Sequence, residues 1–97
     1  MEVSFRKKKR TITEYFVHMD GEKFEFYDVY RTITRIDDNR SSIVMTDQTM
    51  IKVFLVNGII NSPGSRTNGS SIHGATLGPN GKEFIAILEK KRTEMEK

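Results

Sequence analysis

Five consecutive basic residues near the start of the chain are its most conspicuous chemical feature. They are Arg6, Lys7, Lys8, Lys9 and Arg10. Residues 1–10 hold five of the sixteen basic side chains and one of the thirteen acidic ones, a net charge of +4, so the rest of the chain carries −1. Consecutive cations attract phosphate backbones by releasing condensed counterions. The basic run therefore predicts a nucleic-acid contact made by one segment rather than by a broad basic face.

Two arginines farther along the chain, Arg31 and Arg35, are expected to help this contact. Nearby aromatic side chains could provide faces on which unpaired bases stack. They are Tyr15, Phe24, Phe26, Tyr27 and Tyr30. The alternative is that lysines on an edge strand only discourage aggregation between sheets, while the aromatic residues fill the core. Glu25 and Asp28 lie among these aromatic residues and would repel phosphate, which favours the alternative.

A second candidate site is the Gly/Ser-rich segment at residues 61–81. It holds five of the seven glycines, both prolines, four serines and a single charged side chain. Glycine N–H groups and hydroxyls can bind an anion such as a nucleotide. The residues expected to do so are Arg66, Thr67, Asn68, Gly69, Ser70, Ser71 and His73. The glycine spacing matches neither common phosphate-binding fingerprint, so a mobile loop without a ligand is the competing interpretation.

Several kinds of chemistry are not expected. The chain contains no cysteine, which excludes disulfides, thiolate zinc sites and cysteine nucleophiles. The two histidines are isolated in the sequence, and Asp37-Asp38-Asn39 lacks the spaced oxygen ligands of a calcium loop, so we expect no metal and no cofactor. Ser70 and Ser71 fall on the segment least suited to hold a catalytic group rigidly. We therefore predict a binding protein and not an enzyme, in a reducing cytoplasm.

Membrane insertion and secretion are not expected either. Crossing a bilayer takes about 18 consecutive apolar residues, and the longest apolar run, residues 84–88, has five. The segment that follows the basic run includes Glu14, His18 and Asp20, where a signal peptide would need an apolar core.

The first half of the chain is expected to form strands joined by tight turns. Alternating side chains over residues 13–19 predict a strand, and Asp20-Gly21 predicts a two-residue hairpin turn after it. The returning strand changes phase near residues 27–28. We interpret the change as a β-bulge in a strand that continues to residue 35.

Two further strands are predicted at residues 43–45 and 50–56, the second being the most apolar segment of the chain. Asn57-Gly58 follows it directly and is a strong signal for a type I′ turn. Residues 59–60 are therefore expected to pair back against the end of the preceding strand.

The tail is predicted to be helical. Asn80 and Glu83 resemble a capping box, and the apolar residues that follow recur near helical spacing, which predicts a helix over residues 82–97. Residues 84–88 would also suit a buried strand, in which case the helix would begin near residue 89.

Together these elements predict one small, mainly β domain over residues 1–97. The expected α+β fold is a small antiparallel sheet or partly open barrel of about five to six strands with the C-terminal helix. Residues 71–77 could add one short edge strand. The expected function is nucleic-acid binding with little sequence specificity. The alternative is an oligomeric accessory protein that sequesters an anionic small molecule or inhibits a protein partner through the Gly/Ser-rich segment.

Overall fold

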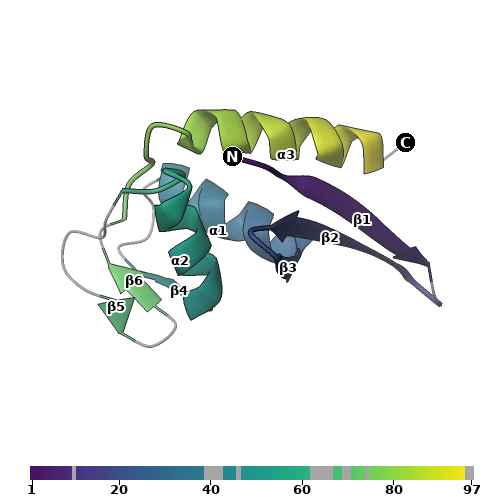
Figure 1. Cartoon of the computed structure of the whole chain (residues 1–97), viewed down its shortest axis with the longest axis horizontal. Helices are drawn as coiled ribbons and strands as arrows, with labels where there is room; N and C mark the ends of the chain where they lie inside the picture. Colours follow the sequence, from purple (N-terminus) through teal and green to yellow (C-terminus); the bar gives the residue numbers. More distant parts are fainter. Residues whose placement is uncertain are drawn as a thin grey trace.

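Strands and helices alternate along the chain, as the computed structural model in Figure 1 shows. The structure describes residues 1–9, 11–38, 43–45, 47–61, 67–68, 71–73 and 75–95. Within these residues the strands are β1 (Ser4–Lys9), β2 (Thr13–Met19), β3 (Glu22–Glu25), β4 (Ile43–Met45), β5 (Thr67–Asn68) and β6 (Ser71–His73). The helices are α1 (Phe26–Asp38), α2 (Gln48–Val56) and α3 (Gly81–Met95). The fold is α+β, with more helix than the sequence predicted.

The strands β1, β2 and β3 form an antiparallel meander in which each strand pairs with the next. The predicted hairpin turn between β2 and β3 is confirmed, because Asp20 and Gly21 have φ angles of 52° and 77°. Positive φ at both central residues is what a type I′ turn requires. The turn sets the register that places Phe24 opposite Val17.

The two faces of this sheet have different surroundings. Val17, Met19 and Phe24 share one face and are buried, and α1 lies behind that face in Figure 1. Because side chains alternate along a strand, the neighbouring side chains of these strands point to the opposite side of the sheet, which we call the open face. The open face carries Ser4, Arg6, Lys8, Glu14, Phe16, His18, Lys23 and Glu25, none of which is buried.

The prediction that the returning strand continues to residue 35 is wrong, because α1 begins at Phe26. Its buried side chains are Phe26, Val29, Thr32, Ile33 and Ile36, which form one helical stripe. The Glu25 carboxylate accepts a hydrogen bond from the Asp28 backbone N–H (2.8 Å) and caps the first turn. The change of phase near residues 27–28 thus marks the passage from strand to helix rather than a bulge.

The strand predicted at residues 50–56 is also a helix, α2. The Asp47 side chain accepts a hydrogen bond from the Met50 backbone N–H (2.8 Å) and supplies the N-cap. Met50, Ile51, Val53 and Phe54 are all buried. An apolar run of this kind has no clear periodicity, so periodicity alone could not distinguish a buried strand from a buried helix.

Asn57-Gly58 ends α2 and does not form a hairpin turn. The Ile59 N–H donates to the Phe54 carbonyl (2.9 Å) and the Gly58 N–H to the Leu55 carbonyl (3.2 Å). These two bonds, with a φ of 69° at Gly58, form a Schellman motif. The predicted pairing of residues 59–60 with the preceding segment is therefore wrong, and Ile60 forms an antiparallel bridge with Leu77 instead.

A second, smaller sheet joins segments that are distant in the sequence. β4 lies where a strand was predicted, but its partner is β6 from the Gly/Ser-rich segment. β6 also pairs with β5, so it is the central strand of this sheet and not the edge strand predicted over residues 71–77. In the part of the chain that is described, the strands form two three-stranded sheets. They do not form the single sheet or barrel of about five to six strands that was predicted.

The expected C-terminal helix is α3, and the last two residues of the predicted range lie outside the described residues. It includes residues 84–88, so the alternative of a buried strand there is wrong. Phe84 and Leu88 are fully buried, and the Phe84 ring meets the Phe54 ring of α2 with centroids 5.5 Å apart. The fifteen buried hydrophobic side chains described form one cluster, drawn from β2, β3, the three helices and residues 59–60. No helix within the described ranges is long and apolar enough to cross a membrane.

Candidate nucleic-acid interface

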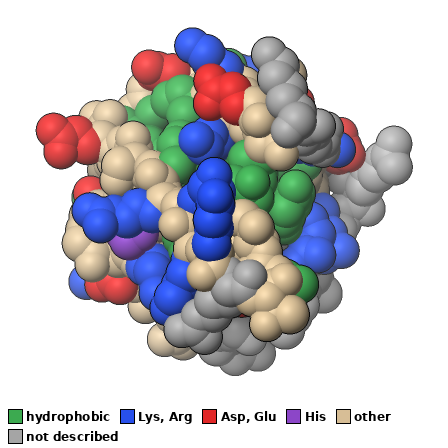
Figure 2. Space-filling model, turned by 90° about the vertical axis from the view of Figure 1, so that its right-hand side faces the viewer, with side chains coloured by type: hydrophobic (Ala, Val, Ile, Leu, Met, Phe, Trp, Pro, Cys, Tyr) green, Lys and Arg blue, Asp and Glu red, His purple; other side chains and the backbone are tan. Residues whose placement is uncertain are grey.

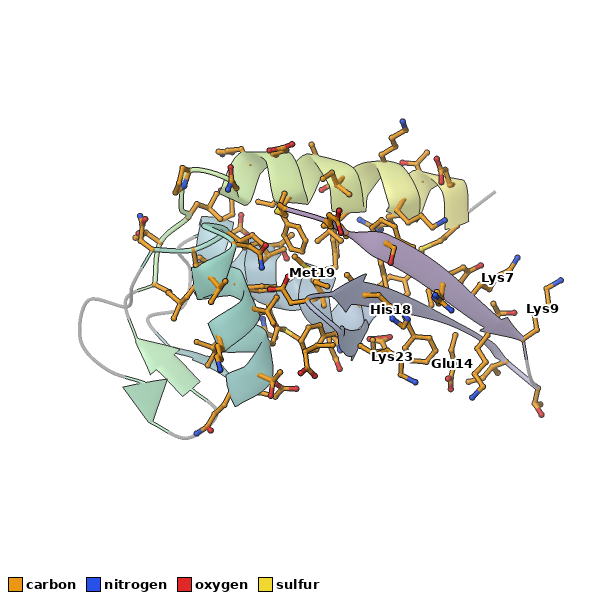
Figure 3. All side chains as sticks on the ribbon, in the orientation of Figure 1. Lys7, Lys9, Glu14, His18, Met19 and Lys23 are labelled. Carbon is orange, nitrogen blue, oxygen red and sulfur yellow. The ribbon has the colours of Figure 1, made fainter. Side chains whose placement is uncertain are left out.

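The basic run forms most of β1, which lies at the edge of the meander sheet. Arg6, Lys7, Lys8 and Lys9 are all exposed, and we call these four residues the basic strand. Arg10 lies outside the described residues. Pairing with β2 places Arg6 and Lys8 on the open face, whereas Lys7 and Lys9 point to the opposite side of the sheet. In Figure 3, Lys7 and Lys9 lie toward the end of the sheet, at the right of the view.

The cations of the basic strand have no close ion-pair partner within the described part of the protein. No ion pair with a described carboxylate involves any of its four side chains, whereas Arg31 pairs with Asp28 (2.7 Å), Lys82 with Asp37 (3.3 Å) and Lys91 with Glu94 (3.7 Å). An unpaired surface cation keeps its hydration and its counterions. It can therefore exchange them for a phosphate group.

An aromatic ring lies in the middle of the open face. Phe16 is only partly buried and sits directly opposite Arg6 of β1 and Glu25 of β3. The Lys23 ammonium lies 4.7 Å from the centroid of the Phe16 ring. A shallow hollow of about 270 Å³ on this side is lined by Arg6, Lys7, Lys8, Phe16, His18 and Lys23. The site thus combines cations with one accessible ring.

Two carboxylates share the open face with these cations. Glu14 lies opposite Lys8, so their charges offset each other in part. The Glu25 carboxylate is directed to the start of α1, where it accepts the hydrogen bond from Asp28 N–H. The positive end of the helix dipole stabilises its negative charge there. Figure 3 shows Glu14 among the labelled side chains of the sheet, with His18 and Lys23 nearer its middle.

Figure 2 views the molecule from the right-hand side of Figure 1. Lysine and arginine side chains gather across the middle of this surface, and acidic side chains lie mainly toward its rim. In the sequence, residues 1–10 hold all of the positive excess.

The two additional arginines predicted for the site are not brought to it. Arg31 and Arg35 are exposed on α1, which packs behind the buried face of the sheet, so neither joins the open face. Arg31 also forms its ion pair with Asp28 on the same helix. Their inclusion in the site depended on the strand predicted through residue 35, and that strand does not exist.

The aromatic residues predicted as stacking platforms lie elsewhere too. Phe24 and Phe26 are buried in the core, and Tyr15 and Tyr30 pack against it. Tyr27 is on α1, edge-on to Phe26 with ring centroids 5.2 Å apart. The alternative interpretation, in which these aromatic residues fill the core, is supported for most of them. Phe16 was missed, although its parity, opposite to that of Val17, was visible in the sequence.

The second predicted site falls in a region that the structure describes only in part. Thr67 and Asn68 form β5, while Ser71 and His73 lie in β6. The remaining predicted ligands, Arg66, Gly69 and Ser70, lie outside the described residues. Binding of an anion or a partner by this segment stays a prediction.

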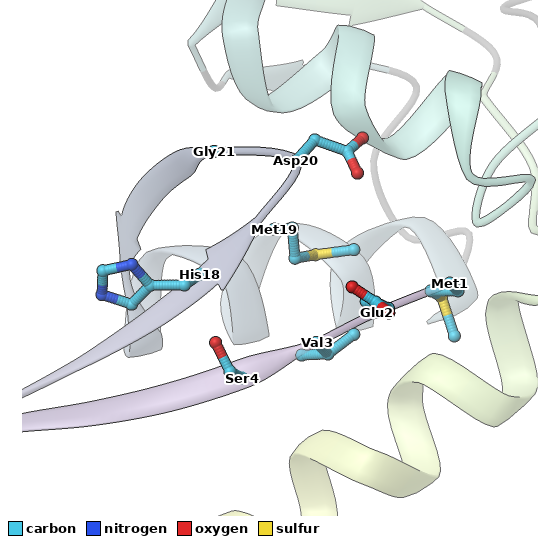
Figure 4. Close-up of a pocket in the computed structure, with 8 residues that line it drawn as sticks. All are labelled: Met1, Glu2, Val3, Ser4, His18, Met19, Asp20 and Gly21. Atoms are coloured by element: carbon cyan, nitrogen blue, oxygen red, sulfur yellow. The ribbon is translucent and has the colours of Figure 1, made fainter.

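A larger hollow of about 630 Å³ lies beside the turn between β2 and β3 (Figure 4). Its lining includes the Glu2 and Asp20 carboxylates and His18. The Asp20 carboxylate accepts a hydrogen bond from the Asn57 side-chain amide (2.8 Å), so it links the turn to the end of α2. Among the described residues, no three side chains of the types that bind metals come together as a metal site requires.

Comparisons with protein-family models, with curated proteins and with solved structures found no match. The function must therefore be inferred from the side chains themselves.

Proposed function

We propose that this protein binds nucleic acid with little sequence specificity, through the basic strand and the adjoining open face. The observation that carries the proposal is the set of four consecutive exposed cations without an ion-pair partner among the described residues. Such a row contacts phosphates and reads no base edges, so it confers affinity without sequence recognition.

The geometry of a strand suits this role. Residues of the same parity on a β-strand are about 7 Å apart, so Arg6 and Lys8 present two separate charges along the open face. Lys7 and Lys9 offer two more on the other side of the same edge strand. A flexible phosphate backbone can follow either row. Each contact releases counterions and adds to the salt dependence of binding.

The proposal is tested by salt-dependent binding with matched triple variants. In the first, Lys7, Lys8 and Lys9 are each replaced by glutamine. In the second, three exposed cations from the three helices, Arg35, Lys52 and Lys90, are replaced in the same way. Both variants lose the same charge, so only the position of the lost charge differs.

We expect the wild type to bind a single-stranded oligonucleotide at about 50 mM salt, with log K falling linearly as log salt rises. The basic-strand variant should lose about 0.7 of that slope for each phosphate contact removed, hence about 2 if all three lysines contact phosphate. The helix variant should keep the wild-type slope. Equal slopes for the two variants, or no binding by the wild type at low salt, would contradict the proposal.

Light scattering supplies a necessary control. Lysines on an edge strand also oppose pairing between sheets of different molecules, so the basic-strand variant could lose apparent affinity by associating with itself. Its mass in solution should equal that of the helix variant at the concentrations used for binding.

A further inference from the structure

We infer that the ligand of this surface is single-stranded nucleic acid, with one unpaired base stacked on Phe16. The inference rests on the proposed function and specifies its substrate class. Its starting observation is a large aromatic side chain that contributes nothing to the core. Phe16 is absent from the buried cluster and from the partly buried residues packed against it, whereas Phe5, Tyr15 and Tyr30 belong to the second group.

The face of the Phe16 ring can be reached from solvent. The Lys23 ammonium already occupies a position 4.7 Å from the ring centroid. A lysine head group is exposed and moves freely on its flexible stem. The attraction between a cation and an exposed ring is weaker than the stacking of a base on an aromatic side chain. A base can therefore take the place of Lys23, whose ammonium is then free to contact phosphate.

The cations around the ring are arranged to hold the backbone of such a base. Arg6 is directly opposite Phe16 across the β1–β2 pairing, while Lys8 is diagonal to it. Cross-strand neighbours of this kind lie within about 5 to 8 Å of each other. Arg6 and the displaced Lys23 thus place positive charge beside the stacked base, to which Lys8 adds less because Glu14 lies opposite it. The carboxylate of Glu25, which lies directly opposite Phe16 on β3, accepts the hydrogen bond from the Asp28 N–H at the start of α1.

This arrangement selects single strands over duplexes. In a duplex both faces of each base are covered by its neighbours, so no base face is available to Phe16 without unstacking. Phosphate contacts alone would attract both forms. Discrimination between them therefore depends on the ring rather than on the charges.

The test uses two substitutions of Phe16 that leave every charge in place. Phe16→Leu keeps an apolar side chain but removes the aromatic face. We expect it to bind a 12-nucleotide oligothymidine about 5- to 100-fold more weakly than the wild type, which is the usual effect of losing one stacked base. Its affinity for a 12-base-pair duplex should be unchanged.

The second substitution, Phe16→Trp, adds the sole tryptophan of the chain, because the natural sequence contains none. Oligothymidine should quench its fluorescence by stacking, whereas inorganic polyphosphate, which offers charge without bases, should not. Circular dichroism and thermal unfolding establish that both variants keep the wild-type fold.

The possible results separate this inference from the proposed function. Loss of single-strand affinity in Phe16→Leu, with quenching by oligothymidine alone, supports the stacking. If the wild type binds but Phe16→Leu binds oligothymidine as tightly as the wild type does, the stacking is wrong and the phosphate contacts stand. If the wild type binds neither ligand at low salt, the proposed function itself fails and the inference falls with it.

Discussion

Tyr30 joins the first and last helices through a small polar network at the edge of the core. Its hydroxyl donates to the Glu89 carboxylate (3.0 Å) and accepts from the Arg92 guanidinium (2.9 Å). Arg92 also lies over the Tyr30 ring, 5.0 Å from its centroid. The ring also stacks on Phe26, with centroids 6.2 Å apart and an interplanar angle of 8°. One side chain thus links charge, hydrogen bonding and packing between α1 and α3.

Burial raises the pKa of Tyr30, and the hydrogen bond donated to Glu89 raises it further, while Arg92 acts in the opposite direction. The folded state therefore binds this proton more tightly than the unfolded chain. The resulting stabilisation is fully present below the pKa of 10.0 of a free tyrosine and is lost as the pH rises through the higher folded-state pKa.

We expect Tyr30→Phe to remove a phenol whose pKa lies above that of a free tyrosine. Absorbance at the phenolate wavelength, followed through a pH titration, measures this directly. Urea unfolding above and below pH 10 should show a smaller alkaline loss of stability in Tyr30→Phe than in the wild type. If the phenolate absorbance gained above pH 10 were the same in Tyr30→Phe as in the wild type, the prediction would be contradicted.

At the scale of the element, the end of α2 depends on one glycine. Gly58 has a φ of 69°, and a side chain there would place its Cβ 3.1 Å from the Asn80 side-chain nitrogen. That nitrogen donates to the Asn57 carbonyl (2.8 Å) and fixes the start of α3 against the end of α2. Both the backbone conformation and the close approach therefore favour glycine.

Gly21 offers a matched comparison, since its φ is 77° but a Cβ added there would meet nothing within 4 Å. Gly21→Ala should lower the free energy of unfolding by about 1–2 kcal/mol, the cost of a left-handed conformation for an L-residue. Gly58→Ala should cost more, because Asn80 must also move. Urea unfolding measures both, and an equal or smaller loss for Gly58→Ala would show that the contact with Asn80 is unimportant.

The same glycine explains a limit of prediction from sequence. Asn-Gly provides a residue that tolerates positive φ, and both a type I′ hairpin and a helix end with a Schellman motif need one. The dipeptide therefore predicted a reversal of the chain at the correct position but could not specify which kind. The preceding apolar run left helix and strand equally open, although Asp47 before it was a usable N-cap signal.

The meander was more predictable because its signals are local and agree with one another. Alternation over residues 13–19 and the Asp20-Gly21 turn both favoured a hairpin, and the structure has one. The basic strand was visible as a run of charges. The parity of Phe16 was visible as well, but its position beside the basic strand, together with His18 and Lys23, follows only from the register of three strands.

At the scale of the whole molecule, α3 closes the core. Leu88 and Phe84 are fully buried among side chains from the sheet and from the other helices. Leu88→Ala should lower the free energy of unfolding by about 2–5 kcal/mol, through lost transfer energy and the cavity left behind. A small protein has little stability to spare, so this single change removes much of it.

Ile87 is the natural control, being only partly buried on the same helix. Ile87→Ala should cost less than Leu88→Ala in urea unfolding, with similar m-values showing that the unfolding reaction is the same. If the order were reversed, α3 would have to be rotated relative to the core from the orientation described above.

The two sheets differ in how far apart their paired strands lie along the chain. This difference affects the order of folding during synthesis. The meander pairs neighbouring strands within residues 4–25, and α1 follows at once. The second sheet pairs Val44 with Ile72. Since contacts between sequence neighbours form fastest and synthesis proceeds from the N-terminus, the meander and α1 can pack before β6 leaves the ribosome. The basic strand would then be folded and exposed while the chain is still attached to the ribosome.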